Sequence, residues 1–125
     1  MTEKKVILII DDSITNNIMI KTLLQRYEYR VLTAFSGKEA LVILESEIPD
    51  VILLDIMMPQ MSGYQVLENI MADPCTQNIP VIIVSAKKDI QAIDKAMKLG
   101  AFDYITKPVT RNAFLEKVEL AIHSH

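Results

Sequence analysis

The most constraining feature of this chain is the regular alternation of short, almost wholly apolar runs with longer stretches of helical periodicity. Val6–Ile10 and Val51–Leu54 contain no polar residue, a pattern typical of strands buried on both faces. Such strands occur in parallel sheets that have helices on both sides. The five predicted strands are Lys5–Ile10, Arg30–Ala34, Val51–Leu54, Val81–Val84 (ending at Ser85) and Phe102–Ile105.

Capping residues predict where the intervening helices begin and end. A serine followed three residues later by Glu or Gln is the capping-box pattern, and it occurs at two of the expected helix starts. A glycine after the fourth periodic stretch is expected to take the left-handed conformation that ends many helices. The first predicted helix begins at Ile14, the second is opened by Ser36 and Glu39 and ends at about Glu45, and the third is opened by Ser62 and Gln65. The fourth covers about Lys88–Leu99 and ends before Gly100, and the fifth is capped by Thr110.

Five strand–helix units in 125 residues predict one doubly wound α/β domain, 1–125, with a mostly parallel sheet and helices on both faces. His123, Ser124 and His125 are interpreted as a tail, native or added. Thirteen Lys and Arg against sixteen Asp and Glu give a net charge of −3, which argues against direct nucleic-acid binding. Cys75 is the single cysteine, the N-terminus lacks a signal-peptide pattern, and no apolar run approaches the roughly 20 residues that cross a bilayer. A cytoplasmic domain without disulfides or membrane insertion is therefore expected.

Polar side chains stand directly after the predicted strands, at the edge where open parallel sheets bind their ligands. Taken singly, each has an ordinary structural explanation as a helix cap, a turn residue or a solvated side chain. Taken together, five side chains of these types at one edge of a sheet indicate a functional site. They are Asp11, Asp12, Asp55, Ser85 and Lys107.

These residue types suit the transfer of a phosphoryl group to a carboxylate. Three carboxylates in one cleft repel one another, by roughly 4 kcal/mol per pair at 4 Å and an effective dielectric near 20, and a hard divalent cation relieves that repulsion. A carboxylate can act as the nucleophile, while the cation, a lysine and a hydroxyl can neutralise or bond the phosphoryl oxygens. The sequence therefore predicts an aspartyl-phosphate site with Mg²⁺ or Mn²⁺ as its cofactor.

Four segments of the chain form an ordered set of motifs: Ile-Asp11-Asp12-Ser, Leu-Leu-Asp55-Ile-Met-Met-Pro59-Gln-Met-Ser-Gly63, Val-Ser85-Ala86 and Asp-Tyr104-Ile-Thr-Lys107-Pro108. In this order and with these spacings, the set resembles the response-regulator receiver domain of two-component signalling, over essentially the whole chain. The resemblance implies the flavodoxin-like strand order 2-1-3-4-5. In that order the first and third strands are neighbours, which would bring the three acids into one pocket.

The resemblance also implies a role for each residue of the site. Asp55 would accept a phosphoryl group from a phosphohistidine on a sensor histidine kinase or on a phosphotransfer protein of a phosphorelay. Asp12, Asp55 and the Met57 backbone carbonyl would hold the cation, with Asp11 acting partly through water. The other implied roles are Lys107 and Ser85 as partners of the phosphoryl oxygens, Tyr104 as a switch aromatic that turns inward, Pro108 as the residue after a cis bond, and Pro59 and Gly63 as part of the loop after the acceptor.

The expected activity is a signalling switch, not turnover of an external substrate. Phosphorylation would shift the face formed by the fourth helix, the fifth strand and the fifth helix, and so control a downstream protein partner, an output domain or a homodimer. Ile90, Ile93 and Met97 are open to two interpretations, as part of that face or as core. Met57 is expected to hinder the water that attacks the phosphoaspartate, and the methionines at 57, 58 and 61 are expected to pack as core beside the site.

Two alternatives come from other function classes. A haloacid-dehalogenase-like phosphatase needs Asp-x-Asp at its nucleophile, and Met57 stands where the second acid is required. A pseudo-receiver, which binds partners without phosphorylation, usually lacks one of the acids or the lysine. All of these residues are present in this chain, which favours a phosphorylatable receiver.

Overall fold

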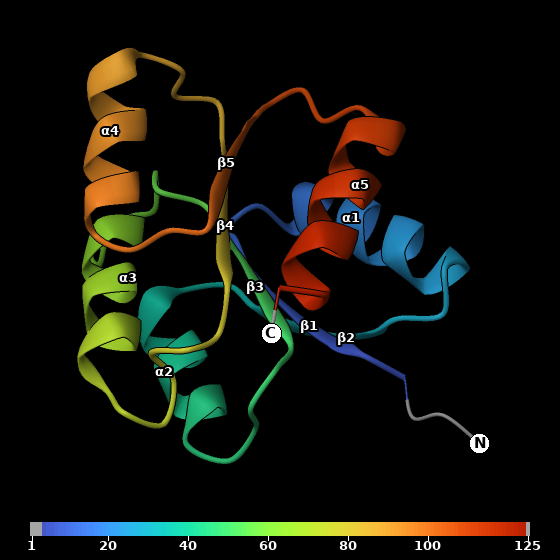
Figure 1. Ribbon diagram of the computed structural model, residues 1–125, viewed down its shortest axis with the longest axis horizontal. Helices are drawn as coiled ribbons and strands as arrows, with labels where there is room; N and C mark the ends of the chain where they lie inside the picture. The colour runs from blue at the N-terminus through green and yellow to red at the C-terminus, as the bar shows by residue number, and fades with distance from the viewer. Residues whose placement is uncertain (1–3, 125) are drawn as a thin grey trace.

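The computed structural model describes residues 4–124, which form a five-stranded sheet between two layers of helices (Figure 1). The strands pair in the order β2-β1-β3-β4-β5 and all pairs are parallel, so the predicted fold and strand order are confirmed. The N-terminal Met1–Glu3 segment and the last tail residue, His125, lie outside the described residues. The elements are β1 (Val6–Ile10), α1 (Ile14–Arg26), β2 (Arg30–Ala34), α2 (Gly37–Leu44), β3 (Val51–Leu54), α3 (Gly63–Ala72), β4 (Val81–Ser85), α4 (Ile90–Lys98), β5 (Asp103–Thr106) and α5 (Arg111–Ile122).

Both faces of the sheet are covered, which explains why its central strands carry no polar residue. Helices α1 and α5 lie on one side of the sheet, and α2, α3 and α4 lie on the other (Figure 1). Successive side chains of a strand point to opposite faces, so Leu8 and Ile10 enter one core while Ile7 and Ile9 enter the other. The result is a rigid sheet whose carboxyl edge presents the loops between strands and helices.

The capping residues act largely as the sequence predicts. Ser62 and Gln65 form a complete capping box at the start of α3. At α2 only half of the box is made, because the Ser36 side chain accepts a hydrogen bond from the backbone N–H of Glu39 and no reciprocal bond is formed. Gly100 follows α4 with a φ of 110°, in the left-handed region that a residue with a side chain rarely adopts.

The structure corrects two predicted boundaries and one predicted cap. Helix α4 begins at Ile90 and not at Lys88, because Asp89 is its cap and accepts a hydrogen bond from the Ala92 backbone N–H at 2.7 Å. Thr110 occupies the cap position of α5, but its side chain makes no capping hydrogen bond. The last strand covers Asp103–Thr106, one residue later than predicted, because it is set by pairing with β4.

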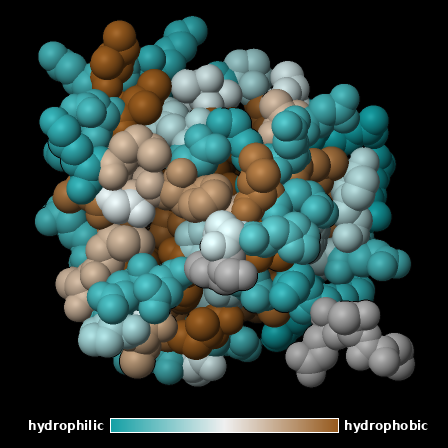
Figure 2. Space-filling view, viewed as in Figure 1, coloured by the Kyte–Doolittle hydropathy of each residue, from teal (hydrophilic) through white to brown (hydrophobic). Residues whose placement is uncertain are grey.

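The surface settles which residues of α4 belong to the core. Ile93 packs against the core, whereas Ile90 is 84% exposed and Met97 is also exposed, so the interpretation of all three as core is wrong. Figure 2 shows apolar side chains projecting among polar ones in the upper left, where α4 begins in Figure 1. Across residues 4–124, no helix combines the length and the hydropathy needed to cross a membrane.

We predict that Gly63→Ala destabilises the fold far more than Gly37→Ala. Both glycines are the first residue of a helix after a serine cap, so helix propensity changes equally. A β-carbon at Gly63 would clash with the Asp55 carbonyl oxygen and lie 2.5 Å from the Ile56 α-carbon, both of which are backbone atoms. The expected loss is about 3 kcal/mol or more in the free energy of unfolding, measured by urea denaturation.

At Gly37 the added β-carbon would meet only side chains, one of them the flexible Met61. The expected loss for Gly37→Ala is therefore about 1 kcal/mol. Equal losses for the two variants would contradict the argument that the Asp55 backbone requires glycine beside it.

Candidate functional site

The pairing of β1 with β3 brings two of the predicted acids together. Ile10 is in register with Leu54, so Asp11 and Asp55, one residue further on in each strand, leave the sheet side by side. The Asp55 backbone N–H donates to the Ile10 carbonyl at 2.9 Å, which extends the pairing up to the site. One carboxylate oxygen from each of Asp11, Asp12 and Asp55 lies within 4.8 Å of the others.

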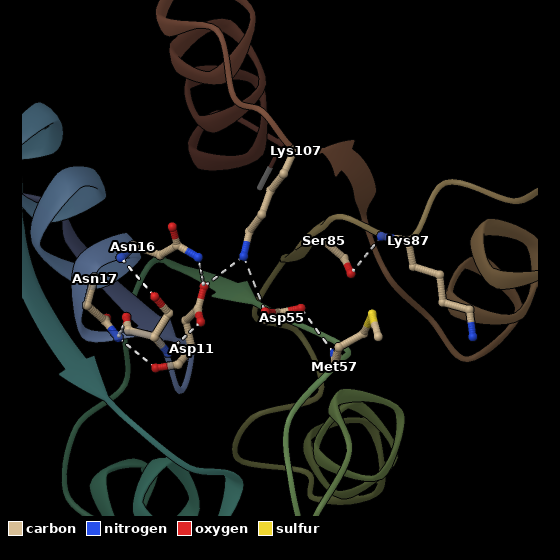
Figure 3. A network of polar contacts seen from close by, with 9 residues as sticks. Asp11, Asn16, Asn17, Asp55, Met57, Ser85, Lys87 and Lys107 are labelled. Carbon is tan, nitrogen blue, oxygen red and sulfur yellow. Dashed lines mark hydrogen bonds and ion pairs between the residues drawn. The ribbon is translucent and has the colours of Figure 1, made fainter.

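The Asp11 side chain is buried and held by its own loop and by α1 (Figure 3). Its Oδ1 accepts a hydrogen bond from the Ser13 backbone N–H at 2.9 Å, and its Oδ2 accepts a long one from Asn16 Nδ2 at 3.4 Å. Ser13, and neither of the two acids, caps α1, so the ordinary explanation of the acids as helix caps is wrong. Asp12 is exposed at the mouth of the site.

Lys107 joins the two buried acids. Its Nζ lies 3.1 Å from Asp11 Oδ2 and 3.3 Å from Asp55 Oδ2, as Figure 3 shows. The Lys107 backbone N–H donates to the Ser85 carbonyl at 2.8 Å, which places the lysine at the carboxyl edge of β4 and β5. One ammonium thus pairs with two of the three clustered carboxylates, and the site keeps an excess of negative charge.

Burial is the largest single influence on the pKa of both Asp55 and Lys107. It raises the pKa of Asp55 above its ordinary value of 3.8, and the hydrogen bond from the Met57 backbone and the charge of Lys107 offset this only in part. Burial also acts to lower the pKa of Lys107, but its hydrogen bonds and charge interactions with Asp11 and Asp55 outweigh it, so the pKa is raised overall. Lys107 therefore stays charged at neutral pH.

The donor set fits a hard divalent cation. The three clustered carboxylates offer only oxygen, the ligand atom that Mg²⁺ and Mn²⁺ prefer in proteins. Asp12 is exposed, so one carboxylate can reach a partly hydrated ion while the two buried acids stay fixed. Met57 follows Asp55 by two residues, and its backbone N–H donates to Asp55 Oδ1 at 3.0 Å. That bond holds the Met57 peptide beside the acids.

Ser85 and Tyr104 are linked through the backbone of Lys87. The fully buried Ser85 hydroxyl oxygen accepts a hydrogen bond from the Lys87 N–H at 3.3 Å, and the Tyr104 hydroxyl donates to the Lys87 carbonyl. Tyr104 is buried, and burial raises the pKa of its phenol, which remains a hydrogen-bond donor. The ordinary explanation of Ser85 as a cap of α4 is wrong, since Asp89 has that position.

The loop after Asp55 differs in part from expectation. Met58 and Met61 pack against the core, but the Met57 side chain is 61% exposed, so its assignment to the core is wrong. The Met57 backbone N–H meanwhile bonds to Asp55, so its backbone faces the site while the residue is exposed. Gly63 is buried and donates its N–H to the Ile56 carbonyl at 2.9 Å, closing the loop.

The remaining loop residues occupy the surface of the same edge. Pro59 is exposed in the loop after Asp55. Pro108 follows Lys107 through a cis peptide bond.

Asn16 and Asn17 were not predicted as part of the site. Both lie in the first turn of α1 and contact Asp11, Asn16 through the carboxylate and Asn17 through the backbone carbonyl. The sequence signal that could have revealed Asn17 is a polar residue on the apolar face of a helix. Asn17 precedes Ile20 and Leu24 by three and seven residues, a spacing that puts all three on the buried face of α1.

The strand order and the placement of the helices define a flavodoxin-like α/β fold. A family model described as "Response regulator receiver domain" matches residues 7–119. The protein PilH of Pseudomonas aeruginosa is 37% identical over 118 residues, a match that covers 93% of this chain and 96% of PilH. The chain belongs to the response regulator receiver domain family.

Relatives differ greatly in length. A Vibrio cholerae protein whose name describes a cyclic di-GMP phosphodiesterase is 41% identical over 119 residues, but the chain spans only 26% of that relative's length. Among solved structures, the receiver domain of the Pseudomonas aeruginosa sensor histidine kinase PA1611 matches with a TM-score of 0.88 and 26% identity, covering 96% of this chain and 98% of that one. Its title describes a magnesium ion coordinated in the active-site cleft.

We predict that Asp55→Asn stabilises the metal-free protein at neutral pH. A raised pKa means that the native state binds the proton more tightly than the unfolded state, so the contribution of Asp55 to stability falls as the pH rises. Asparagine keeps an oxygen for the Met57 N–H and removes the buried charge. The expected result is a higher urea midpoint near pH 7 and a smaller difference near pH 4.5.

Asp94→Asn serves as the matched control, because Asp94 is an exposed acid of α4 whose ion pair with Lys98 lies at the surface. Its urea midpoint should change little at either pH. A midpoint for Asp55→Asn equal to or below that of the wild type near pH 7 would contradict the prediction.

Proposed function

We propose that this chain is a phosphorylation-dependent signalling switch that accepts a phosphoryl group from a phosphohistidine onto Asp55. The observation that carries the proposal is the cluster of three carboxylates, two of which share one ammonium, with Lys107 Nζ 3.1 Å from Asp11 and 3.3 Å from Asp55. A pseudo-receiver has no need to retain such a set, and two of its acids are buried at a cost in stability.

The chain's own residues would align and neutralise the transferred group. One Asp55 carboxylate oxygen forms the bond to phosphorus as the bond from phosphorus to the histidine nitrogen breaks, and the nitrogen keeps the electron pair. Lys107 moves from pairing two carboxylates to pairing the phosphoryl oxygens. The three carboxylates, with the Met57 backbone carbonyl, would hold Mg²⁺ or Mn²⁺, which would offset the charge of the phosphoryl oxygens. The magnesium ion described for the PA1611 receiver domain supports this choice of ion.

Ser85 and Tyr104 form the proposed switch. Phosphorylation adds charge and acceptor oxygens at Asp55. A hydrogen bond from the Ser85 hydroxyl to a phosphoryl oxygen would therefore stabilise only the phosphorylated state. The Lys87 backbone, bonded to both Ser85 and Tyr104, would carry that change into α4. The populations of two arrangements shift, and the face of α4, β5 and α5 changes with them.

Receiver domains interact with histidine kinases or phosphotransfer proteins, and we assign this chain the same kind of donor in the cytoplasm. Exposed apolar side chains on α4, Ile90 and Met97, suit contact with a protein that reads the switched face. That reader is a separate protein, an output domain of the kind that longer relatives have room for, or a second copy of this chain. The domain itself turns over no external substrate.

We expect wild-type protein incubated with acetyl phosphate and Mg²⁺ to gain the mass of one phosphoryl group, measured by intact-mass spectrometry. Asp55→Asn should gain none, because its amide cannot act as the nucleophile. A chelator should abolish the gain in the wild type. No gain in the wild type at any acetyl phosphate concentration would overturn the proposal and favour the pseudo-receiver.

We expect Met57→Asn to speed loss of the phosphoryl group by about tenfold, or roughly 1.4 kcal/mol in activation free energy. The Met57 side chain is apolar and stands at the mouth of the site, where it would hinder the attacking water that an amide would instead bind (Figure 3). The measurement is the decay of phosphorylated protein after removal of the donor.

Met19→Asn is the matched control, since Met19 is also 61% exposed but lies on α1, away from Asp55. Its decay rate should equal that of the wild type. An unchanged rate in Met57→Asn would remove the proposed role of Met57 in the lifetime.

A further inference from the structure

Asn17 holds the backbone of the loop that carries two of the acids. The residue is 2% exposed, and its Nδ2 donates to the Asp11 carbonyl at 2.6 Å and to the Ser13 carbonyl at 3.2 Å (Figure 3). The Ser13 carbonyl also accepts from the Asn17 backbone N–H in the first turn of α1. Among the side-chain hydrogen bonds that Asn17 makes within residues 4–124, the bond to the Asp11 carbonyl is therefore the one that reaches beyond α1 and its cap, Ser13.

The position of Asn17 is otherwise one for an apolar residue. It shares the buried face of α1 with Ile20 and Leu24, and within residues 4–124 no protein group donates to its Oδ1. Burying an amide oxygen without a donor is unfavourable, so the Oδ1 of Asn17 gives no reason for an amide at this position. The amide must be explained by what its Nδ2 holds.

The Asp11 carbonyl is one half of the peptide group that joins Asp11 to Asp12. Because this group is planar, fixing its oxygen also fixes the backbone nitrogen of Asp12 and the direction in which that residue continues. The Asp11 carboxylate has further contacts with Ser13, Asn16 and Lys107, whereas no hydrogen bond or ion pair from the described part of the chain reaches the Asp12 carboxylate. Asp12 is thus directed by its backbone alone.

We propose that Asn17 is a positioning residue that orients the Asp11–Asp12 peptide group so that the Asp12 carboxylate faces the same cation as Asp55. The inference rests on the proposed function, because it concerns the cation that the three acids would hold. Outer contacts that orient ligands typically change metal affinity by 10- to 100-fold when removed.

The test compares Asn17→Leu with the wild type for Mg²⁺ affinity by isothermal titration calorimetry and for melting temperature without metal. Affinity should fall by about tenfold or more, while the melting temperature changes by less than about 5 °C. The temperature change is small because leucine removes the unpaired Oδ1 but leaves the Asp11 carbonyl unpaired, so the number of such groups is unchanged.

A second variant and a control separate positioning from folding. Asn17→Ser keeps a hydroxyl that can bond the Ser13 carbonyl within the helix but is too short to reach the Asp11 carbonyl, so it should lose the same affinity. Asn69→Leu is the matched control, because Asn69 Nδ2 also donates to a carbonyl four residues earlier, that of Gln65, but within α3 and without contact with the three acids among the hydrogen bonds of the described residues. Its Mg²⁺ affinity should equal that of the wild type.

A readout without metal completes the test. Hydrogen exchange of the Asp12 and Ser13 amides should be faster in both Asn17 variants, while the amides of β3 keep their wild-type protection. Unchanged Mg²⁺ affinity in both variants, beside a wild type that binds Mg²⁺, would overturn this inference and leave the proposed function standing. A loss of affinity matched by a large fall in melting temperature in both variants would assign Asn17 a structural role. A wild type that binds no Mg²⁺ and gains no phosphoryl group would overturn both.

Discussion

The parallel pairing of β1 with β3 is the interaction on which the rest of this structure depends. It places Asp11 and Asp55 side by side at the end of two buried strands, where their charges repel in a poorly solvated environment. Lys107 reaches across from the end of β5 to pair with both of them. The sheet therefore holds a cluster of charge that its own lysine only partly neutralises.

Several features of the site favour function over stability. A buried Asp55 with a raised pKa, a buried ion pair and a buried asparagine with an unpaired oxygen each cost more than a well-packed apolar residue. The two apolar cores, one on each face of the sheet, can offset these costs. Such violations of ordinary packing are expected to gather at functional sites, and here they lie within one edge of the sheet.

The sequence predicted the strands, most of the helices and the group of strand-end residues, because each depends on a short-range pattern. Buried strands lack polar residues, and a serine cap is recognised by the Glu or Gln three residues after it. The errors also have local causes. The predicted start of α4 at about Lys88 precedes the true cap, Asp89, by one residue. The exposure of Met57 lies in a loop, where periodicity does not distinguish core from surface.

The sequence by itself determined the fold class and the chemical character of the site, since apolar periodicity and acid-after-strand spacing are properties of the chain. Only the tertiary structure decided which side of α1 is buried, that Lys107 pairs with two acids at once, and that Asn17 faces the Asp11 carbonyl. These contacts join residues from separate elements or depend on which helix face meets the sheet. Spacing along the chain constrains such geometry weakly, because packing of the whole domain sets it.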